Sequence, residues 1–281
     1  MMNLSLMDPA FLGSLTSQFF LDLYPNASAA YSLRQLSAGI TSVIRVRRSS
    51  DNAEADFTAT QITDGSLASW VGAANNGFVR TWYDQSGNAG HAIQTTTSLQ
   101  PTIVSSGALI VEGGKPAIHF DGKVLQRPTA NILFPFFSFA VVKSGGTGIR
   151  GYFGGGQTKV ALGQQQGGSF NPVNSFWAWA PNLATTYGLQ NSFNNNRNLF
   201  SYFIPSGVVS NWKWYSNGSE VGAPGLSSDT AVDGTGGFIG ATGNFAEEWN
   251  GPIQEIILYP SDVTTSRTLI EQNINSYYSI Y

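Results

Sequence analysis

The stretch GPIQEIILYP (residues 251–260) has the pattern of a β-strand and is bounded by glycine and proline. Similar segments recur along the chain, and loops rich in glycine and asparagine separate them. They are SVIRVRR (42–48), GFVRTWYD (77–84), PAIHFDG (116–122), FFSFAVVKS (136–144), FWAWA (176–180), NWKWYSNG (211–218) and GGFIGA (236–241). Many short strands, few helices, 32 glycines and no fixed-period repeat predict an all-β fold, a two-sheet antiparallel β-sandwich.

Three segments have helical patterns. Residues 8–23 (DPAFLGSLTSQFFLDL) predict a short amphipathic N-terminal helix that ends before Pro25. Residues 27–37 could form a second helix, and residues 261–280 predict a C-terminal helix. The expected apolar stripe of that last helix is Leu269, Ile270, Ile274 and Tyr277.

The chain is therefore expected to divide into an N-terminal helical segment, residues 1–26, and a sandwich, residues 27–281. The helix could pack on its own domain. It carries apolar side chains on more than one face, however, so it could also dock on a partner protein. The candidate docking residues are Phe11, Leu12, Leu15, Phe19 and Phe20.

The composition excludes several functional classes. Charged residues make up 11% of the chain, against about 25% in an average protein, and the net charge is −3. Without a basic run, binding to a nucleic-acid backbone is not expected. The absence of cysteine excludes disulfide and thiol chemistry and fits folding in a reducing cytoplasm. The longest apolar run (132–142) is too short to span a bilayer, and the first residues lack the basic start of a signal peptide.

The stretch TWYDQSGNAGHA (81–92) contains the residue types of a hydrolase triad, Asp84, Ser86 and His91. The run from Gln85 to Asn88 has the composition of a turn, and Ser86 lacks the G-x-S-x-G context of a nucleophile elbow. The sequence therefore predicts a turn in which Asp84 accepts hydrogen bonds from backbone N–H groups.

Other patterns give weak indications of a cofactor or metal site. The glycines of VVKSGGTGIRG (141–151) have dinucleotide-site spacing, but no helix pattern follows them, so a loop is expected. The carboxylates of Asp51, Glu54 and Asp56 could bind calcium. Pairing of these carboxylates with neighbouring arginines is the preferred interpretation, so no cofactor is expected. The arginines are Arg45, Arg47 and Arg48.

Aromatic residues on the later strands could form a carbohydrate-binding groove, because sugars stack on aromatic rings. Nearby amide side chains could form hydrogen bonds with the sugar hydroxyls. The candidate carbohydrate-binding residues are Trp177, Trp179, Tyr187, Trp212 and Trp214. The alternative is that these side chains fill the core of the sandwich, and this alternative is preferred for at least one tryptophan pair.

Two regions resemble known families. The first includes VIRVRRSSDNAEADF (43–57), FVRTWYDQSGNAGHAIQ (78–94) and GKPAIHFDG (114–122). It resembles the catalytic domain of family 54 α-L-arabinofuranosidases, and more closely a module of bacteriophage virion and tail proteins. The second, from KWYSNGSEVG (213–222) to the end of the chain, resembles the closing strands and helix of laminin-G-type sandwiches. The resemblance implies a concanavalin-like jelly roll.

The resemblance does not imply the family's catalytic residues. The segment that would carry the family's nucleophile, FWAWAPNLATTYG (176–188), contains no carboxylate. The segment that would carry its acid, GGFIGATGN (236–244), contains none either. Loss of both carboxylates removes the family's double-displacement route, so the expectation is a protein without enzymatic activity and without catalytic residues.

The expected function is that of a phage virion structural or decoration protein in a capsid, fibre or tail. It would be made in the host cytoplasm and exposed on the virion surface, with other virion proteins as partners through residues 1–26. Host or environmental glycans are further candidate partners, a homo-oligomer is compatible with the sequence, and no membrane or nucleic acid is expected. Two alternatives remain open: a glycan-binding receptor adhesin, and a glycoside hydrolase that uses other carboxylates such as Glu247 or Glu248.

Overall fold

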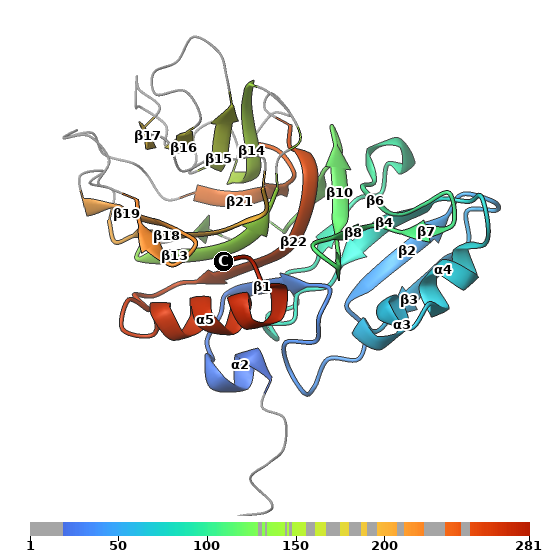
Figure 1. Ribbon diagram of the computed structural model, residues 1–281, viewed down its shortest axis with the longest axis horizontal. Coiled ribbons are helices and arrows are strands. Elements are labelled where there is room, and N and C mark those ends of the chain that lie inside the picture. The colour runs from blue at the N-terminus through green and yellow to red at the C-terminus, as the bar shows by residue number, and fades with distance from the viewer. Residues whose placement is uncertain are drawn as a thin grey trace, which may run out of the picture.

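The computed structural model (Figure 1) shows an antiparallel β-sandwich with few helices, which confirms the predicted fold class. The structure describes residues 19–128, 131–132, 134–143, 145, 148–155, 161–166, 175–179, 187–189, 196–206, 211–221, 234–242 and 248–281.

The segment 251–260 forms most of the long strand β22 (Asn250–Tyr259), which lies at the centre of the fold. Three strands far apart in the sequence pair with it antiparallel. They are β1 (Ala29–Ser32), β10 (Ile118–Asp121) and β13 (Phe136–Val142). Residues 27–37, for which a helix was considered, therefore supply a buried strand, because β1 pairs along its whole length with β22.

One sheet extends from β22 in both directions. Beyond β13 it continues through β18 (Asn198–Ile204), β19 (Lys213–Ser216) and β20 (Ser219–Glu220). Beyond β10 it continues through β6 (Thr102–Ser105), β4 (Gly77–Trp82), β2 (Ile44–Arg48) and β3 (Glu54–Phe57). Short additions are β7 (Ala108–Leu109), which pairs with β6, and the hairpin of β8 (Val111–Glu112) and β9 (Lys115–Pro116).

The second sheet packs against the first and is joined to it through β4. Its strands are β17 (Tyr187–Leu189), β16 (Ser175–Trp179), β15 (Ala161–Gln166), β14 (Gly148–Gly155), β21 (Gly234–Ile239), β12 (Asn131–Ile132), β11 (Leu125–Gln126) and β5 (Ala92–Ile93). Because β5 pairs with both β11 and β4, the two sheets are continuous at this corner.

Strand β13 shows why the sequence FFSFAVV forms a central strand. All of its residues are buried, because one face lies in the core between the sheets and the other faces the C-terminal helix. The first face carries Phe136, Ala140 and Val142. The second carries Phe137, Phe139 and Val141. A strand covered on both faces is expected to be almost continuously apolar.

The helix that covers this second face is α5 (Arg267–Tyr278), which lies along the sheet in Figure 1. It buries Ile270, Ile274 and Tyr278. Two details of the prediction for 261–280 were wrong. The helix begins at Arg267, and Leu269 is 56% exposed because its side chain is on the outer face.

The remaining helices are short. The helix α2 (Phe20–Leu23) lies beside α5, whereas α3 (Ala59–Thr63) and α4 (Ser66–Val71) lie beside β2 and β3 (Figure 1). A 3₁₀ turn, η2 (Thr97–Leu99), precedes β6. Of the helix expected over 8–23, only the last turn is described, and the remainder lies outside the described residues. Within the parts of the chain that are described, no helix has the length and apolar character to cross a membrane.

Candidate functional site

The turn after β4 is organised by the buried carboxylate of Asp84. Its Oδ1 accepts hydrogen bonds from the backbone N–H groups of Ala30 (2.8 Å) and Ser86 (2.9 Å). Its Oδ2 accepts from Ser86 Oγ (2.8 Å) and from the N–H of Gly90 (3.0 Å). With four donors on one carboxylate, Asp84 fixes both the turn and the neighbouring strand β1.

Ser86 and His91 do not form a triad with Asp84. The Nδ1 atom of His91 accepts the backbone N–H of Asp84 at 3.1 Å, so it carries no proton to donate to a carboxylate. The hydroxyl of Ser86 donates to Asp84 and not to His91. A nucleophile needs a base within hydrogen-bond reach, and this arrangement does not supply one. The predicted turn is confirmed.

The carboxylates considered for calcium are paired with arginines. Asp56 binds Arg45 at 2.8 Å, and Asp51 binds Arg48 at 2.7 Å. The hydrogen bond from Arg45 holds the pKa of Asp56 below its ordinary value. Glu54 lies 3.7 Å from Arg80. No group of three metal-ligating side chains is found among the described residues.

The expectation for Arg47 was wrong. Its Nε donates to Gln100 (2.7 Å) and its Nη1 to Asn52 (2.7 Å), so its partners are amides and not carboxylates. The guanidinium also lies over the ring of Phe78, 4.7 Å from the centroid.

Two of the candidate carbohydrate-binding tryptophans belong to the core. Trp212 and Trp214 are each only 1% exposed. Trp214 packs against Tyr202 of β18 with 5.7 Å between the ring centroids, and Trp212 Nε1 donates to the carbonyl of Ser206. A ring enclosed in this way cannot stack on a sugar, so the binding role is wrong for this pair.

The other candidates of that set stay predictions. Trp177 and Trp179 lie on β16 and Tyr187 lies on β17, but their side chains are outside the described part of the structure.

Only some of the candidate docking residues lie in the described part of the structure. Phe11, Leu12 and Leu15 lie outside the described residues. Phe20 is 3% exposed and packs in the second core cluster beneath α5, so a docking role for this residue is wrong. Phe19 is partly buried and remains a candidate.

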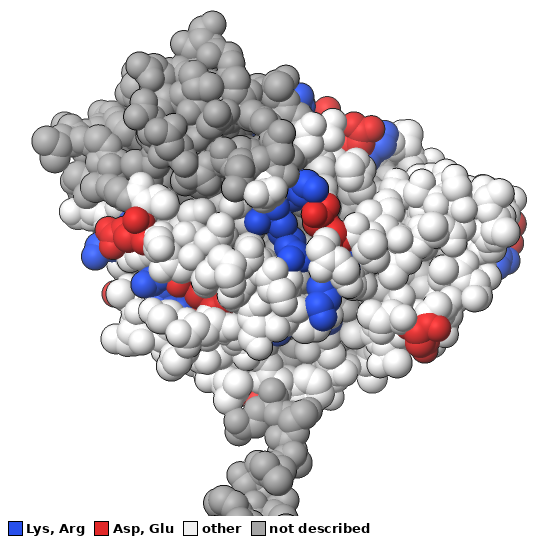
Figure 2. Space-filling view, viewed as in Figure 1, with Lys and Arg blue, Asp and Glu red and all other residues white. Residues whose placement is uncertain are grey.

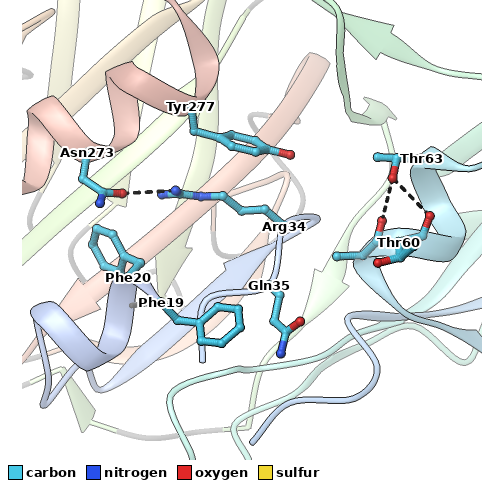
Figure 3. Close-up of a pocket in the computed structure, with 9 residues that line it drawn as sticks. Phe19, Phe20, Arg34, Gln35, Thr60, Thr63, Asn273 and Tyr277 are labelled. Carbon is cyan, nitrogen blue, oxygen red and sulfur yellow. Dashed lines mark hydrogen bonds between the residues drawn. The ribbon is translucent and has the colours of Figure 1, made fainter. Parts of the chain in front are cut away.

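Phe19 lines a pocket of about 340 Å³ between α2, α3 and α5 (Figure 3). Arg34 also lines this pocket, but its guanidinium is already bound. It donates to both carboxylate oxygens of Glu255 (2.8 and 2.9 Å) and to Asn273 Oδ1 (3.1 Å). The rings of Phe20 and Tyr277 also lie near its charge. The cation therefore holds the fold together and is not free for a ligand.

A pair of carboxylates lies where β10 ends beside the start of β22. Asp121 pairs with Asn250 in the strand register, and Asn250 Nδ2 donates to Asp121 Oδ1 at 3.3 Å. The next residue, Gly122, has a φ of 60°, and a Cβ atom there would lie 2.8 Å from Glu248 Oε2. Glycine thus leaves room for the Glu248 carboxylate next to the residue that follows Asp121.

The backbone of Glu248 is held from the second sheet. Arg150 Nη1 donates to the carbonyl of Glu248 at 3.0 Å, and Gly151 forms an isolated bridge with Glu248. Asp121 is exposed and Glu248 is partly exposed, so both carboxyl groups can meet solvent and a ligand. The sequence alone suggested Glu248 but gave it no partner, because only the tertiary structure brings the end of β10 near it.

A second cavity, of about 390 Å³, is formed around the corner where β5 and β11 pair. Its lining residues are His91, Ile93, Gln94, Thr95, Gln126, Arg127 and Pro128. Most of them have polar side chains. Its volume is within the range of small-molecule sites.

The face of the molecule in Figure 2 carries few charged side chains over its described part, and these are gathered in small groups of mixed sign. This agrees with the low charged content of the sequence.

Comparison of the sequence with protein families and with curated proteins gives no match. Comparison of the structure does. A GH54 α-L-arabinofuranosidase soaked with a cyclic sulfate inhibitor aligns over 88% of this chain with a TM-score of 0.66 and 15% identity. An arabinofuranosidase complexed with arabinofuranosyl-α-1,2-xylobiose aligns over the same share with a TM-score of 0.67 and 16% identity. The chain spans 62% of the length of each.

This likeness shows a shared fold and corrects one expectation. The chain was expected to have no enzymatic role, but the solved structures that share its fold over most of its length are glycoside hydrolases.

Proposed function

We propose that this chain is a carbohydrate-directed domain that hydrolyses glycosidic bonds, with Asp121 and Glu248 as its reacting carboxylates. The observation that carries the proposal is the position of the Glu248 carboxylate against Gly122, the residue that follows Asp121, on a fold shared with arabinofuranosidases.

Glycoside hydrolysis needs two carboxyl groups on either side of the bond that breaks. One donates a proton to the leaving oxygen, and the other attacks the anomeric carbon or activates a water molecule. The segments that resemble the family's catalytic segments contain no carboxylate, so the reaction would require acids from other strands. Asp121 ends β10, and Glu248 precedes the paired strand β22 with its carboxylate against Gly122, so the two residues are our candidates for these acids.

Neutralising either carboxylate is expected to lower turnover about a hundredfold, because proton transfer by a positioned carboxyl group contributes at least that factor. The variants are Glu248→Gln and Asp121→Asn, and the measurement is release of reducing sugar from α-L-arabinofuranosides and from bacterial surface polysaccharides. Glu220→Gln serves as the matched control, because Glu220 is an exposed carboxylate on β20. Wild-type turnover in Glu248→Gln would overturn the proposal, as would a wild-type chain inactive on every substrate.

We also propose, on the sequence resemblance, that the domain is carried on the surface of a phage particle. The segments RVRRSSDNAE (45–54) and WYDQSGN (82–88) support this, since they resemble a module of virion and tail proteins. Other virion proteins would then be its partners, through the N-terminal segment.

Deletion of residues 2–18 is expected to remove the protein from purified particles and to leave the thermal midpoint of the isolated chain unchanged. The deletion stops before Phe19 because Phe20 packs in the core. Loss of the Phe20 ring would destabilise the fold, and that effect could not be distinguished from loss of docking. Incorporation is measured by quantitative mass spectrometry of particles. Particles that retain the truncated chain at the normal level would contradict the docking role.

A further inference from the structure

Arg127 is a buried cation that lacks an anionic partner. The residue follows β11 and is 6% exposed. Its Nε donates to the hydroxyl of Tyr31 at 2.8 Å, whereas its Nη1 has no hydrogen-bond partner. Within the described ranges no carboxylate forms an ion pair with it. A buried guanidinium in this state is costly, since charges inside proteins are normally paired and hydrogen-bonded.

The groups around Arg127 do not balance its charge. Burial raises the pKa of Tyr31 to about 12, so its hydroxyl is neutral at pH 7. The rings of Tyr31 and Phe153 lie 5.6 and 5.3 Å from the guanidinium carbon and offer only cation–π attraction. The carboxylate of Asp84 also influences Tyr31 electrostatically. Its two oxygens, however, already accept four hydrogen bonds from other groups.

Arg127 lines the 390 Å³ pocket, and the other lining groups suit a sugar. His91 accepts a hydrogen bond at Nδ1, so in its neutral form the ring proton is on Nε2 and can be donated to a hydroxyl oxygen. Thr95 and the amide of Gln126 are exposed at the rim. Ile93, which is 38% exposed, adds an apolar surface.

We infer that this pocket binds a sugar that carries a carboxylate, such as a uronic acid, with the carboxylate held by Arg127 and the hydroxyls by His91 and Gln126. The inference rests on the proposed carbohydrate-directed function and names the class of glycan. A carboxylate is favoured over a phosphate because, among the described lining residues, only Arg127 has a permanent charge, and one guanidinium matches one negative charge.

The test is titration of the full chain, in separate experiments, with D-galacturonate, D-galactose and inorganic phosphate. Binding is measured by NMR or by calorimetry. We expect binding of galacturonate and at least about tenfold weaker binding of the other two, which corresponds to about 1.4 kcal/mol. Replacing Arg127 could disturb the core around Tyr31, so the decisive variant is Gln126→Glu. This change is isosteric, is made at an exposed position, and places a like charge beside the bound carboxylate.

Gln126→Glu is expected to weaken galacturonate binding about tenfold and to leave the thermal midpoint unchanged. Gln126→Ala is the matched control and should have a smaller effect. Equal affinity for galactose would overturn the role of Arg127, equal affinity for phosphate would overturn the assignment of a sugar, and no binding of galacturonate would overturn the inference as a whole. Glu248→Gln separates the two proposals, because it should stop hydrolysis without weakening galacturonate binding.

Discussion

Asp84→Ala is expected to lower the free energy of unfolding by about 3 to 5 kcal/mol. The variant leaves the N–H groups of Ala30 and Gly90 without their acceptor, and Ala30 is fully buried. Each buried donor that loses its partner costs about 1 to 3 kcal/mol. The midpoint of urea unfolding, followed by tryptophan fluorescence, measures the loss.

The control for this prediction is Ser86→Ala. In a catalytic triad it would abolish activity and hardly change stability. In the turn observed here it removes one partly buried hydroxyl, so a change of about 1 kcal/mol or less is expected, with activity retained. A stable Asp84→Ala variant, or an inactive Ser86→Ala variant that is fully folded, would contradict the framework role of this turn.

The same turn shows which features can be predicted from the sequence. Strands β2, β4, β10, β13 and β19 follow local patterns of apolar residues bounded by turn residues, and they lie within the segments expected for them. The run from Gln85 to Asn88 is also a local signal, since Gly and Asn residues favour turns wherever they occur. Local patterns are enough in such cases because backbone preference and burial agree.

Prediction failed where the partner strand decides the structure. The residues of β1 are small or lack β-branching, and only pairing with β22 makes them a strand. A signal for α3 was present and was missed. Thr58 and Gln61 form a capping box, in which Thr58 Oγ1 accepts the N–H of Gln61 at 3.1 Å and Gln61 Oε1 accepts the N–H of Thr58 at 3.0 Å.

The candidate sites were hidden for the same reason. Asp121 and Glu248 are far apart in the sequence; the pairing of β10 with β22 brings Asp121 to Asn250, and the Glu248 carboxylate then lies against Gly122. Arg127 resembles any surface arginine in the sequence, and its significance depends on burial beside Tyr31 without a carboxylate. Composition and motif spacing do not reveal either property, because both depend on contacts between distant segments.

The second large effect is expected at Glu255, where a buried ion pair joins β1, β22 and α5. Glu255 is 1% exposed, and its carboxylate accepts hydrogen bonds from Arg34, from Ser32 Oγ (2.7 Å) and from Tyr278 Oη (3.2 Å). Glu255→Ala leaves the guanidinium of Arg34 partly buried without a counter-charge. We expect a loss of about 3 to 5 kcal/mol in the free energy of unfolding, as for other broken buried pairs.

A double-mutant cycle isolates this pair from the packing around it. Arg34→Met removes the cation and keeps an apolar chain between the rings of Phe20 and Tyr277, so the double variant avoids an uncompensated charge. We therefore expect Arg34→Met with Glu255→Ala to cost less than the sum of the two single changes, with a coupling energy of about 1 to 3 kcal/mol. Strictly additive losses would show that the pair contributes through packing alone. The attachment of α5 to the sheet would then depend on Ile270, Ile274 and the ring of Tyr278, and not on charge.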